Sequence, residues 1–239
     1  MEATLNKVMR RIVLAGSLIV SACSYAAETH TSGGNFAGNA TPTKYVLTIS
    51  AIEFHKVGDG ATVFVPFVDT SAEWDIASAN PDANIGTMSS TKSLPAGTYD
   101  KIRFTVSKTM TIQGATASLN GGAPCRTESD AQTVTNPFGA GVLDIGYLGA
   151  RDGAASEPET VTVPSGSDVE ASSDFTDLGT SFRGVLTLPN TFTISGTGGL
   201  PTIKLKFDVT NAMQFVVLPD QTNRCIVFPG PPSLAVDVT

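Results

Sequence analysis

The sequence is poor in the residues that carry most enzymatic chemistry. Its 239 residues include only two histidines, His30 and His55. A Ser-His-Asp hydrolase would depend on His55, which we predict to be a surface or turn histidine at a strand end, and the Gly-x-Ser-x-Gly turn is missing. Carboxylates that meet in space can hydrolyse glycosides, but aromatic residues make up only 7% and indicate no sugar-binding cleft. We therefore predict that the protein is not an enzyme.

Charge and helical periodicity are scarce as well. Charged residues make up 15% of the chain, and removal of residues 1–26 would leave 12 basic and 21 acidic residues, a net charge of −9. An acidic surface repels phosphate backbones and anionic lipids, so we expect no nucleic-acid partner and no membrane contact except through a lipid anchor. After the first 27 residues, no stretch shows a sustained helical period, which favours an all-β fold.

The first 27 residues have the pattern of a secretory signal. Lys7, Arg10 and Arg11 precede an apolar run over 12–22, which ends in small residues. The run is about 11 residues long, whereas a membrane-spanning helix needs about 20. A basic region, a short apolar region and small residues before a cut define a signal peptide. We therefore expect the protein to work outside the cytoplasm of a bacterium, in or beyond the cell envelope.

Two cleavage sites compete in this segment. Ser24-Tyr25-Ala26 suits an ordinary signal peptidase that cuts after Ala26, whereas Val20-Ser21-Ala22-Cys23 resembles a lipobox, in which Cys23 becomes the lipidated first residue. Stable anchoring takes more than one acyl chain, and lipoprotein processing supplies several. The choice therefore decides between a tethered lipoprotein and a released protein, and the sequence leaves both open.

Two cysteines, Cys125 and Cys225, remain after the signal. In an oxidising compartment they predict one disulfide. The bond would close a loop of about 100 residues and stabilise the fold by about 4 kcal/mol in the chain-entropy description. The alternative, two reactive thiols or a metal pair, has neither a Cys-x-x-Cys spacing nor a nearby histidine to support it.

Period-2 alternation defines the domain that follows. Residues 27–43 are polar and glycine-rich and predict a flexible linker, so that 44–239 form a single domain. Tyr45, Leu47 and Ile49 alternate with Val46, Thr48 and Ser50, and the apolar phase then shifts, which predicts a bulge near Ser50 and Ala51. Pro66 makes the strand predicted over 62–68 an edge strand or a broken one. Further strands are predicted over 101–106, 142–148, 182–188, 191–194, 202–209, 213–218 and 233–239, with a long loop over 120–140.

About ten to twelve short strands separated by turns are typical of an antiparallel β-sandwich. Three pieces of the chain, at 45–55, 94–104 and 203–209, also resemble a bacterial family of secreted or lipid-anchored β-sandwich domains of unknown function. The turn Leu94-Pro95-Ala96-Gly97-Thr98-Tyr99 is the most specific of them. The resemblance implies an immunoglobulin-like or transthyretin-like sandwich in the cell envelope. It supplies no catalytic residues.

Two kinds of ligand site are open on the sequence. Asp168, Glu170, Asp174 and Asp177 offer the oxygen ligands that Ca²⁺ prefers, but the EF-hand spacing is absent, so a solvated acidic loop is the competing interpretation. Glycan binding would use the aromatic rings of Trp74, Tyr99 or Tyr147. For each of these three residues, packing in the core is the better interpretation.

The terminal strand suggests a different role. Leu234, Val236 and Val238 share one face of a strand that follows the proline-rich segment 229–232. Such a strand, or the segment 27–43, can leave its own sandwich and pair with the open edge of a neighbour; an ordinary last strand and an ordinary linker are the competing interpretations. We therefore predict a structural or interaction protein, in its sharpest form the subunit of an extracellular filament or surface layer. Its expected partners are other copies of itself or another cell-surface protein. A monomeric surface lipoprotein that binds a glycan or Ca²⁺ is the alternative.

Overall fold

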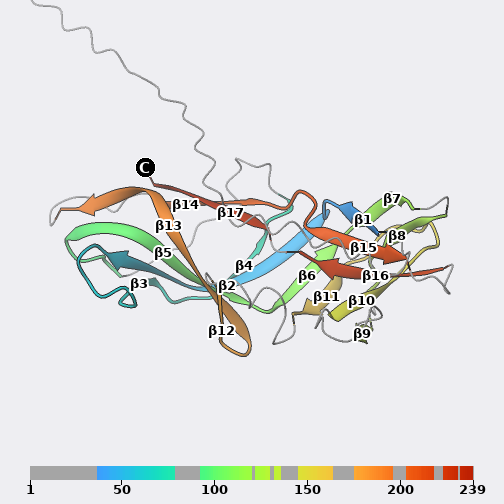
Figure 1. The fold of residues 1–239 in the computed structure, drawn as a ribbon, viewed down its shortest axis with the longest axis horizontal. Coiled ribbons are helices and arrows are strands. Elements are labelled where there is room, and N and C mark those ends of the chain that lie inside the picture. The colour runs from blue at the N-terminus through green and yellow to red at the C-terminus, as the bar shows by residue number, and fades with distance from the viewer. Residues whose placement is uncertain are drawn as a thin grey trace, which may run out of the picture.

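The computed structural model describes residues 37–78, 92–119, 122–129, 132–135, 145–163, 175–195, 203–217, 223–230 and 232–238. Every regular element in these ranges is a β-strand, and the strands pair in the antiparallel sense (Figure 1). No helix among these residues is long and apolar enough to cross a membrane. The predicted all-β antiparallel class is confirmed, whereas the immunoglobulin-like or transthyretin-like topology stays a prediction.

The larger sheet is built around β2 (Lys44–Lys56). Eight strands of the described residues belong to it. One side of β2 pairs with β5 and then β6, and β3 and β4 also pair with β2. β13 continues the sheet beyond β5, and β11 continues it beyond β6. The bounds are β3 Val65–Val68, β4 Ala72–Asp75, β5 Gly97–Ser107, β6 Thr109–Gln113, β11 Glu159–Thr162, β12 Phe175–Asp177 and β13 Ser181–Ile194.

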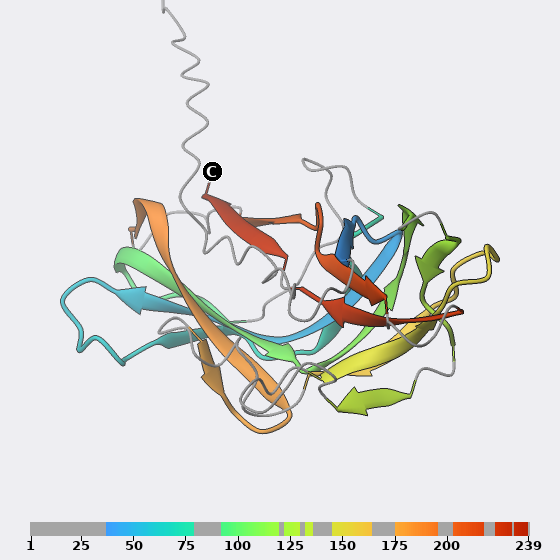
Figure 2. The ribbon, with the colours of Figure 1, turned by 45° about the vertical axis from the view of Figure 1, so that its right-hand side comes forward.

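Two smaller sheets complete the described fold. Seven strands form one of them, in the order β1-β15-β16-β10-β8-β7, with β9 paired to β10. β14 and β17 form a separate two-stranded sheet. Figure 2 shows these sheets from a second direction. The bounds are β1 Ala37–Ala40, β7 Ala115–Ser118, β8 Pro124–Arg126, β9 Thr133–Thr135, β10 Ile145–Ala150, β14 Ile203–Asp208, β15 Met213–Val217, β16 Arg224–Pro229 and β17 Ser233–Val238.

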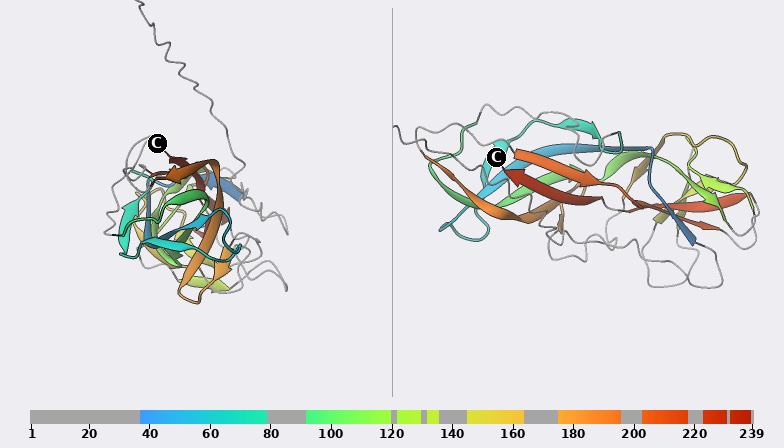
Figure 3. Two further views of the ribbon diagram at one scale, coloured as in Figure 1. Left: turned by 90° about the vertical axis from the view of Figure 1, so that its left-hand side faces the viewer. Right: turned by 90° about the horizontal axis from the view of Figure 1, so that it is seen from above.

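Two hydrophobic cores lie along one elongated body (Figure 3). The first core joins one end of the eight-stranded sheet to the seven-stranded sheet through residues such as Leu47, Ile112 and Phe215. The second joins the rest of the eight-stranded sheet to the β14–β17 sheet, with Phe54 and Val236 among its buried members. The layering is therefore sandwich-like, with one long sheet opposed by two shorter ones.

The alternation in β2 explains how one strand serves both cores. Ile49 lies opposite Val106, and Ala51 lies opposite Thr105, so the register shifts at Ser50 and the predicted bulge is present. An extra residue at a bulge moves the following side chains to the other face. The shift keeps Leu47 buried in the first core and Ile52 buried in the second.

Some boundaries differ from the sequence-based prediction. The predicted linker 27–43 ends in a strand, because Ala37–Ala40 pairs with β15, and Gly38 lets the side chain of Leu119 approach to 2.6 Å from where a Cβ would stand. The predicted loop 120–140 contains β8 and β9. The edge strand that holds Pro66 starts at Val65 rather than at 62. These strands are short and show no clear alternation. The sequence did not predict them because they are defined by pairing with strands that are distant in the chain.

The turn over 94–99, the most specific part of the resemblance, is held in place by Tyr99. The hydroxyl of Tyr99 donates a hydrogen bond to the carbonyl of Pro95 at 2.7 Å, in the manner of a tyrosine corner. The Tyr99 ring is fully buried and stacks on Phe192, with 5.2 Å between the ring centroids. The turn over 94–99 therefore closes the second core at the start of β5.

A buried lysine marks the point where β5 becomes β6. Lys108 is 2% exposed, and its Nζ lies 2.6 Å from Oδ1 of Asp177 and 4.7 Å from the ring centre of Phe182. The backbone of Lys108 binds the segments on both sides. Its N–H donates a hydrogen bond to the carbonyl of Thr180, and its carbonyl accepts one from the N–H of Val163. Lys108 therefore connects the two strand pairs, β5–β13 and β6–β11, that meet here.

We predict that Lys108→Met lowers the free energy of unfolding by about 2–4 kcal/mol, because it removes the cation that neutralises Asp177 and keeps most of the buried volume. Urea denaturation measures the effect. Asp177→Asn in the same chain should recover part of the loss. Equal stability of Lys108→Met and the natural chain, or purely additive effects of the two changes, would contradict the role given to this ion pair.

Candidate interaction site at the terminal strand

The last strand has a single backbone partner in the described structure. β17 pairs along its length with β14, where Leu205 lies opposite Val236 and Phe207 lies opposite Leu234. The two strands share no ladder with the larger sheets among the described residues. Val236 is 6% exposed and belongs to the second core, against which Leu205 and Phe207 also pack. β17 therefore contributes to this core through Val236, while β14 is its one backbone partner among the described strands.

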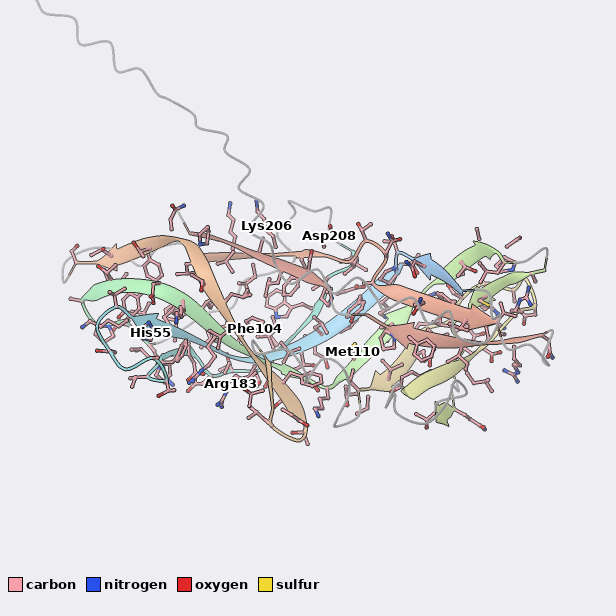
Figure 4. The ribbon with its side chains drawn as sticks, viewed as in Figure 1. His55, Phe104, Met110, Arg183, Lys206 and Asp208 are labelled. Carbon is pink, nitrogen blue, oxygen red and sulfur yellow. The ribbon has the colours of Figure 1, made fainter. Side chains whose placement is uncertain are left out.

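The other face of this strand pair is polar. Lys206 lies opposite Ala235, and Asp208 lies opposite Ser233. Figure 4 shows Lys206 and Asp208 along the upper edge of the molecule, with Arg183 on the lower side. Hydrogen bonds from Thr210 lower the pKa of the Asp208 carboxyl, so it stays ionised. One face of the pair is thus apolar, with Val236 buried and Leu205, Phe207 and Leu234 partly buried, whereas the other face carries Lys206 and the exposed Asp208.

The segment just before β17, which we call its root, is fixed to the first core through Gly230. In the proline-rich segment 229–232, the N–H of Gly230 donates to the carbonyl of Ala212 at 2.8 Å, and the hydroxyl of Tyr45 donates to the carbonyl of Gly230 at 2.9 Å. Tyr45 is 1% exposed, and burial raises the pKa of its hydroxyl far above the usual value. β17 therefore follows directly after a segment that is fixed at Gly230.

The predicted disulfide partners meet in the seven-stranded sheet. Cys125 of β8 and Cys225 of β16 are fully buried, and their side chains approach to 2.7 Å. A sulfur–sulfur bond measures about 2.05 Å, so both residues stand here as free thiols. Both strands flank β10 at Gly149, where a Cβ would lie 2.5 Å from the Arg126 carbonyl oxygen and 3.3 Å from the Cys225 sulfur. The contact with Cys125, together with burial, raises the pKa of the Cys225 thiol far above its usual value.

The residues predicted to bind Ca²⁺ are only partly described. Asp177 is engaged within the fold, because its carboxylate pairs with Lys108 and accepts a hydrogen bond from the N–H of Gly179 at 2.7 Å. The described ranges contain no group of three or more His, Cys, Asp or Glu residues that could hold a metal ion. Asp168, Glu170 and Asp174 lie outside these ranges, as do Cys23 and His30.

The three aromatic candidates for glycan binding belong to the cores. Tyr99 and Tyr147 are buried, and Trp74 packs between the two cores. The hydroxyl of Tyr147 donates to the carbonyl of Thr162 at 2.6 Å and accepts from the Thr162 N–H at 2.8 Å. The packing interpretation of these residues therefore matches the structure, and none of them is an open platform for a sugar ring.

The prediction of a surface histidine at position 55 is wrong. His55 is 6% exposed, and its Nδ1 lies 2.6 Å from Oδ1 of Asp100 on the neighbouring strand. Its Nε2 is buried and has no hydrogen-bond partner among the described residues. Phe64 packs near the ring, with 5.6 Å between centroids. The partner on β5 is 45 residues away in sequence, and no local pattern indicates it.

Two further polar clusters were not predicted from the sequence. Arg103 donates two hydrogen bonds to Glu53, at 2.6 and 2.8 Å. In the seven-stranded sheet, Arg126 donates two hydrogen bonds of 2.8 Å to Asp152, and these hold the pKa of that carboxyl well below its usual range. Each cluster joins strands or loops far apart in sequence, and each satisfies its own charges. We assign them to the fold rather than to a ligand.

The fold and the terminal strand thus define an antiparallel, sandwich-like all-β protein. Residues 39–227 match the family described as "Domain of unknown function (DUF4382)", and because this match covers most of the chain, the chain belongs to that family. No curated protein and no solved structure shows a significant similarity to the chain.

We predict that Tyr45→Phe loosens β17, because it removes the hydrogen bond that fixes Gly230. Loss of one buried hydrogen bond lowers the free energy of unfolding by about 1 kcal/mol, and hydrogen exchange in residues 233–238 should become several-fold faster. Tyr147→Phe is the control, since its hydroxyl bonds Thr162 on β11 rather than the segment before β17. Equal exchange of β17 in both variants would show that Tyr45 does not hold the root.

Proposed function

We propose that this chain is a non-enzymatic structural protein of the bacterial cell envelope or exterior, which self-associates by exchanging β17 between copies. One observation carries the proposal: β17 fills the second core with Val236, while among the described strands its backbone pairs with β14 alone. The secretory pattern of the first 27 residues supports the location. A lipid on Cys23 would tether such an assembly, and a cut after Ala26 would release it.

The energetics of strand exchange favour self-association through β17. A strand that leaves its own chain and enters an identical neighbour re-forms the same ladder and the same core contacts, so the net cost is small. Main-chain hydrogen bonds supply the strength, and alternate side chains such as Leu234 and Val236 supply the fit. Head-to-tail exchange that does not close into a ring gives an open filament. The fixed root at Gly230 gives each strand a defined point of departure.

The described residues that the alternative function could use are engaged within the fold. Of the predicted Ca²⁺ ligands, Asp177 pairs with Lys108, and of the predicted glycan-binding rings, Tyr99 and Tyr147 are buried and Trp74 packs between the two cores. These contacts favour a structural role over a monomeric surface lipoprotein with a ligand. His55 lacks a hydrogen-bonded nucleophile among the described residues, which supports a role without catalysis.

A cysteine pair placed across the β14–β17 ladder tests the exchange. Lys206 and Ala235 lie directly opposite each other, so Lys206→Cys with Ala235→Cys forms a disulfide wherever the two strands pair. In residues 27–239 expressed with this pair, we expect a ladder of covalent multimers on non-reducing denaturing gels. Each single variant is a control, because it forms dimers at most. A product of internally bonded monomers alone would overturn the proposal.

We further propose that Cys125 and Cys225 form a disulfide across β10 in the exported protein. Two thiols lose two protons and two electrons to a disulfide oxidant of the envelope, which is reduced to two thiols. The bond ties β8 to β16, whose cysteines already meet beside Gly149. It fixes the seven-stranded sheet while β17 exchanges at the other core.

Intact mass of the exported protein tests this bond. We expect a mass about 2 Da below that of the reduced chain, and no alkylation after denaturation unless a reductant is added. The variant with Cys125→Ala and Cys225→Ala should lose about 2–5 kcal/mol of stability to urea. Two alkylated cysteines in the unreduced, denatured protein would refute the bond.

A further inference from the structure

Glu159 is a carboxylic acid placed inside the first core. It lies on β11, the four-residue strand at the edge of the eight-stranded sheet, opposite Ile112 of β6. The residue is fully buried, as are Ile112 and Val161, its neighbour on the same face. Both carboxylate oxygens are inaccessible to water and have no hydrogen-bond partner among the described residues. An isolated charge in such a place costs far more than a neutral carboxyl.

Among the described residues, no cation pairs with Glu159. β10 contributes Tyr147, whose hydroxyl is already bonded to Thr162. The segment after β8 contributes Glu128, which pairs with Arg224 and Arg126. β6 carries no titratable residue. Burial, with a smaller contribution from the charge of Glu128, raises the pKa of Glu159 to about 8.

We infer that Glu159 is a proton-dependent latch on the edge strand β11: the neutral carboxyl allows β11 to stay on β6, and the ionised carboxyl releases it. β11 is four residues long and has a single partner strand in the described structure, with the Tyr147 hydroxyl as a further anchor at Thr162. Release of this short strand from β6 brings the charge into water. Release exposes the backbone edge of β6, and an open edge is a site where another strand can add. The latch is independent of β17 exchange.

The direction of the pH effect follows from linkage. In the released strand the carboxyl meets water and titrates near its ordinary pKa of 4.5, whereas in the closed strand it titrates near 8. The closed form therefore holds one more proton between these two values. Opening becomes about tenfold easier for each pH unit in this window and levels off above pH 8. β11 is thus held most firmly in acid and least firmly in mildly alkaline medium.

Hydrogen exchange of residues 109–113 and 159–163 between pH 5.5 and 8.5 tests the latch in residues 27–239. After correction for intrinsic exchange, we expect protection in the natural chain to fall about tenfold per pH unit up to pH 8. Glu159→Gln, which cannot ionise, should show constant protection. Glu73→Gln is the matched control, since Glu73 is an exposed glutamate on the edge strand β4, and it should keep the natural pH dependence.

Constant protection in the natural chain, or the same slope in Glu159→Gln, would overturn the inference. If Glu159→Gln does not fold, carbon-13 NMR of glutamate side-chain carboxyls in the natural chain decides the matter. One carboxyl should titrate near pH 8, and its midpoint should coincide with the levelling of β11 exchange. Titration of every glutamate near its ordinary value would refute the latch.

Discussion

The long ladder between β2 and the bent pair β5–β6 is the constraint on which the rest of the structure depends. β2 runs through both cores, and the bulge at Ser50 lets Leu47 before it face the first core and Ile52 after it face the second. Because the cores share this ladder, the seven-stranded sheet and the β14–β17 pair need no ladder with each other in the described residues. One end of the molecule can therefore stay closed while the other exchanges a strand.

Buried polar groups lie where this architecture changes from one strand pair to the next. Lys108 marks the bend between β5 and β6 and is neutralised by Asp177, whereas Glu159 lies on the edge strand beside that bend and has no partner in the described part of the chain. A paired buried charge fixes a connection, and an unpaired one makes it depend on protonation. We therefore expect the bend at Lys108 to stay closed and the edge strand β11, which carries Glu159, to open.

Patterns of local origin could be predicted from the sequence. The alternation of Tyr45, Leu47 and Ile49, the bulge after them and the edge position of Pro66 all follow from side-chain period and backbone chemistry, and all are present. The burial of His55 and Glu159 could not be predicted, because their surroundings come from strands distant in sequence. Strand β1 was missed for a related reason: its alanines and glycine carry no pattern, and only the neighbouring β15 makes them a strand.

Negative-stain microscopy of the exported protein, combined with the intact mass of its mature N-terminus, tests the central claim most directly. Exchange of β17 between copies predicts filaments or extended arrays of elongated subunits from purified protein. Dispersed single particles at every concentration, carrying a diacylated or triacylated Cys23, would contradict it and would leave a tethered monomer on the cell surface.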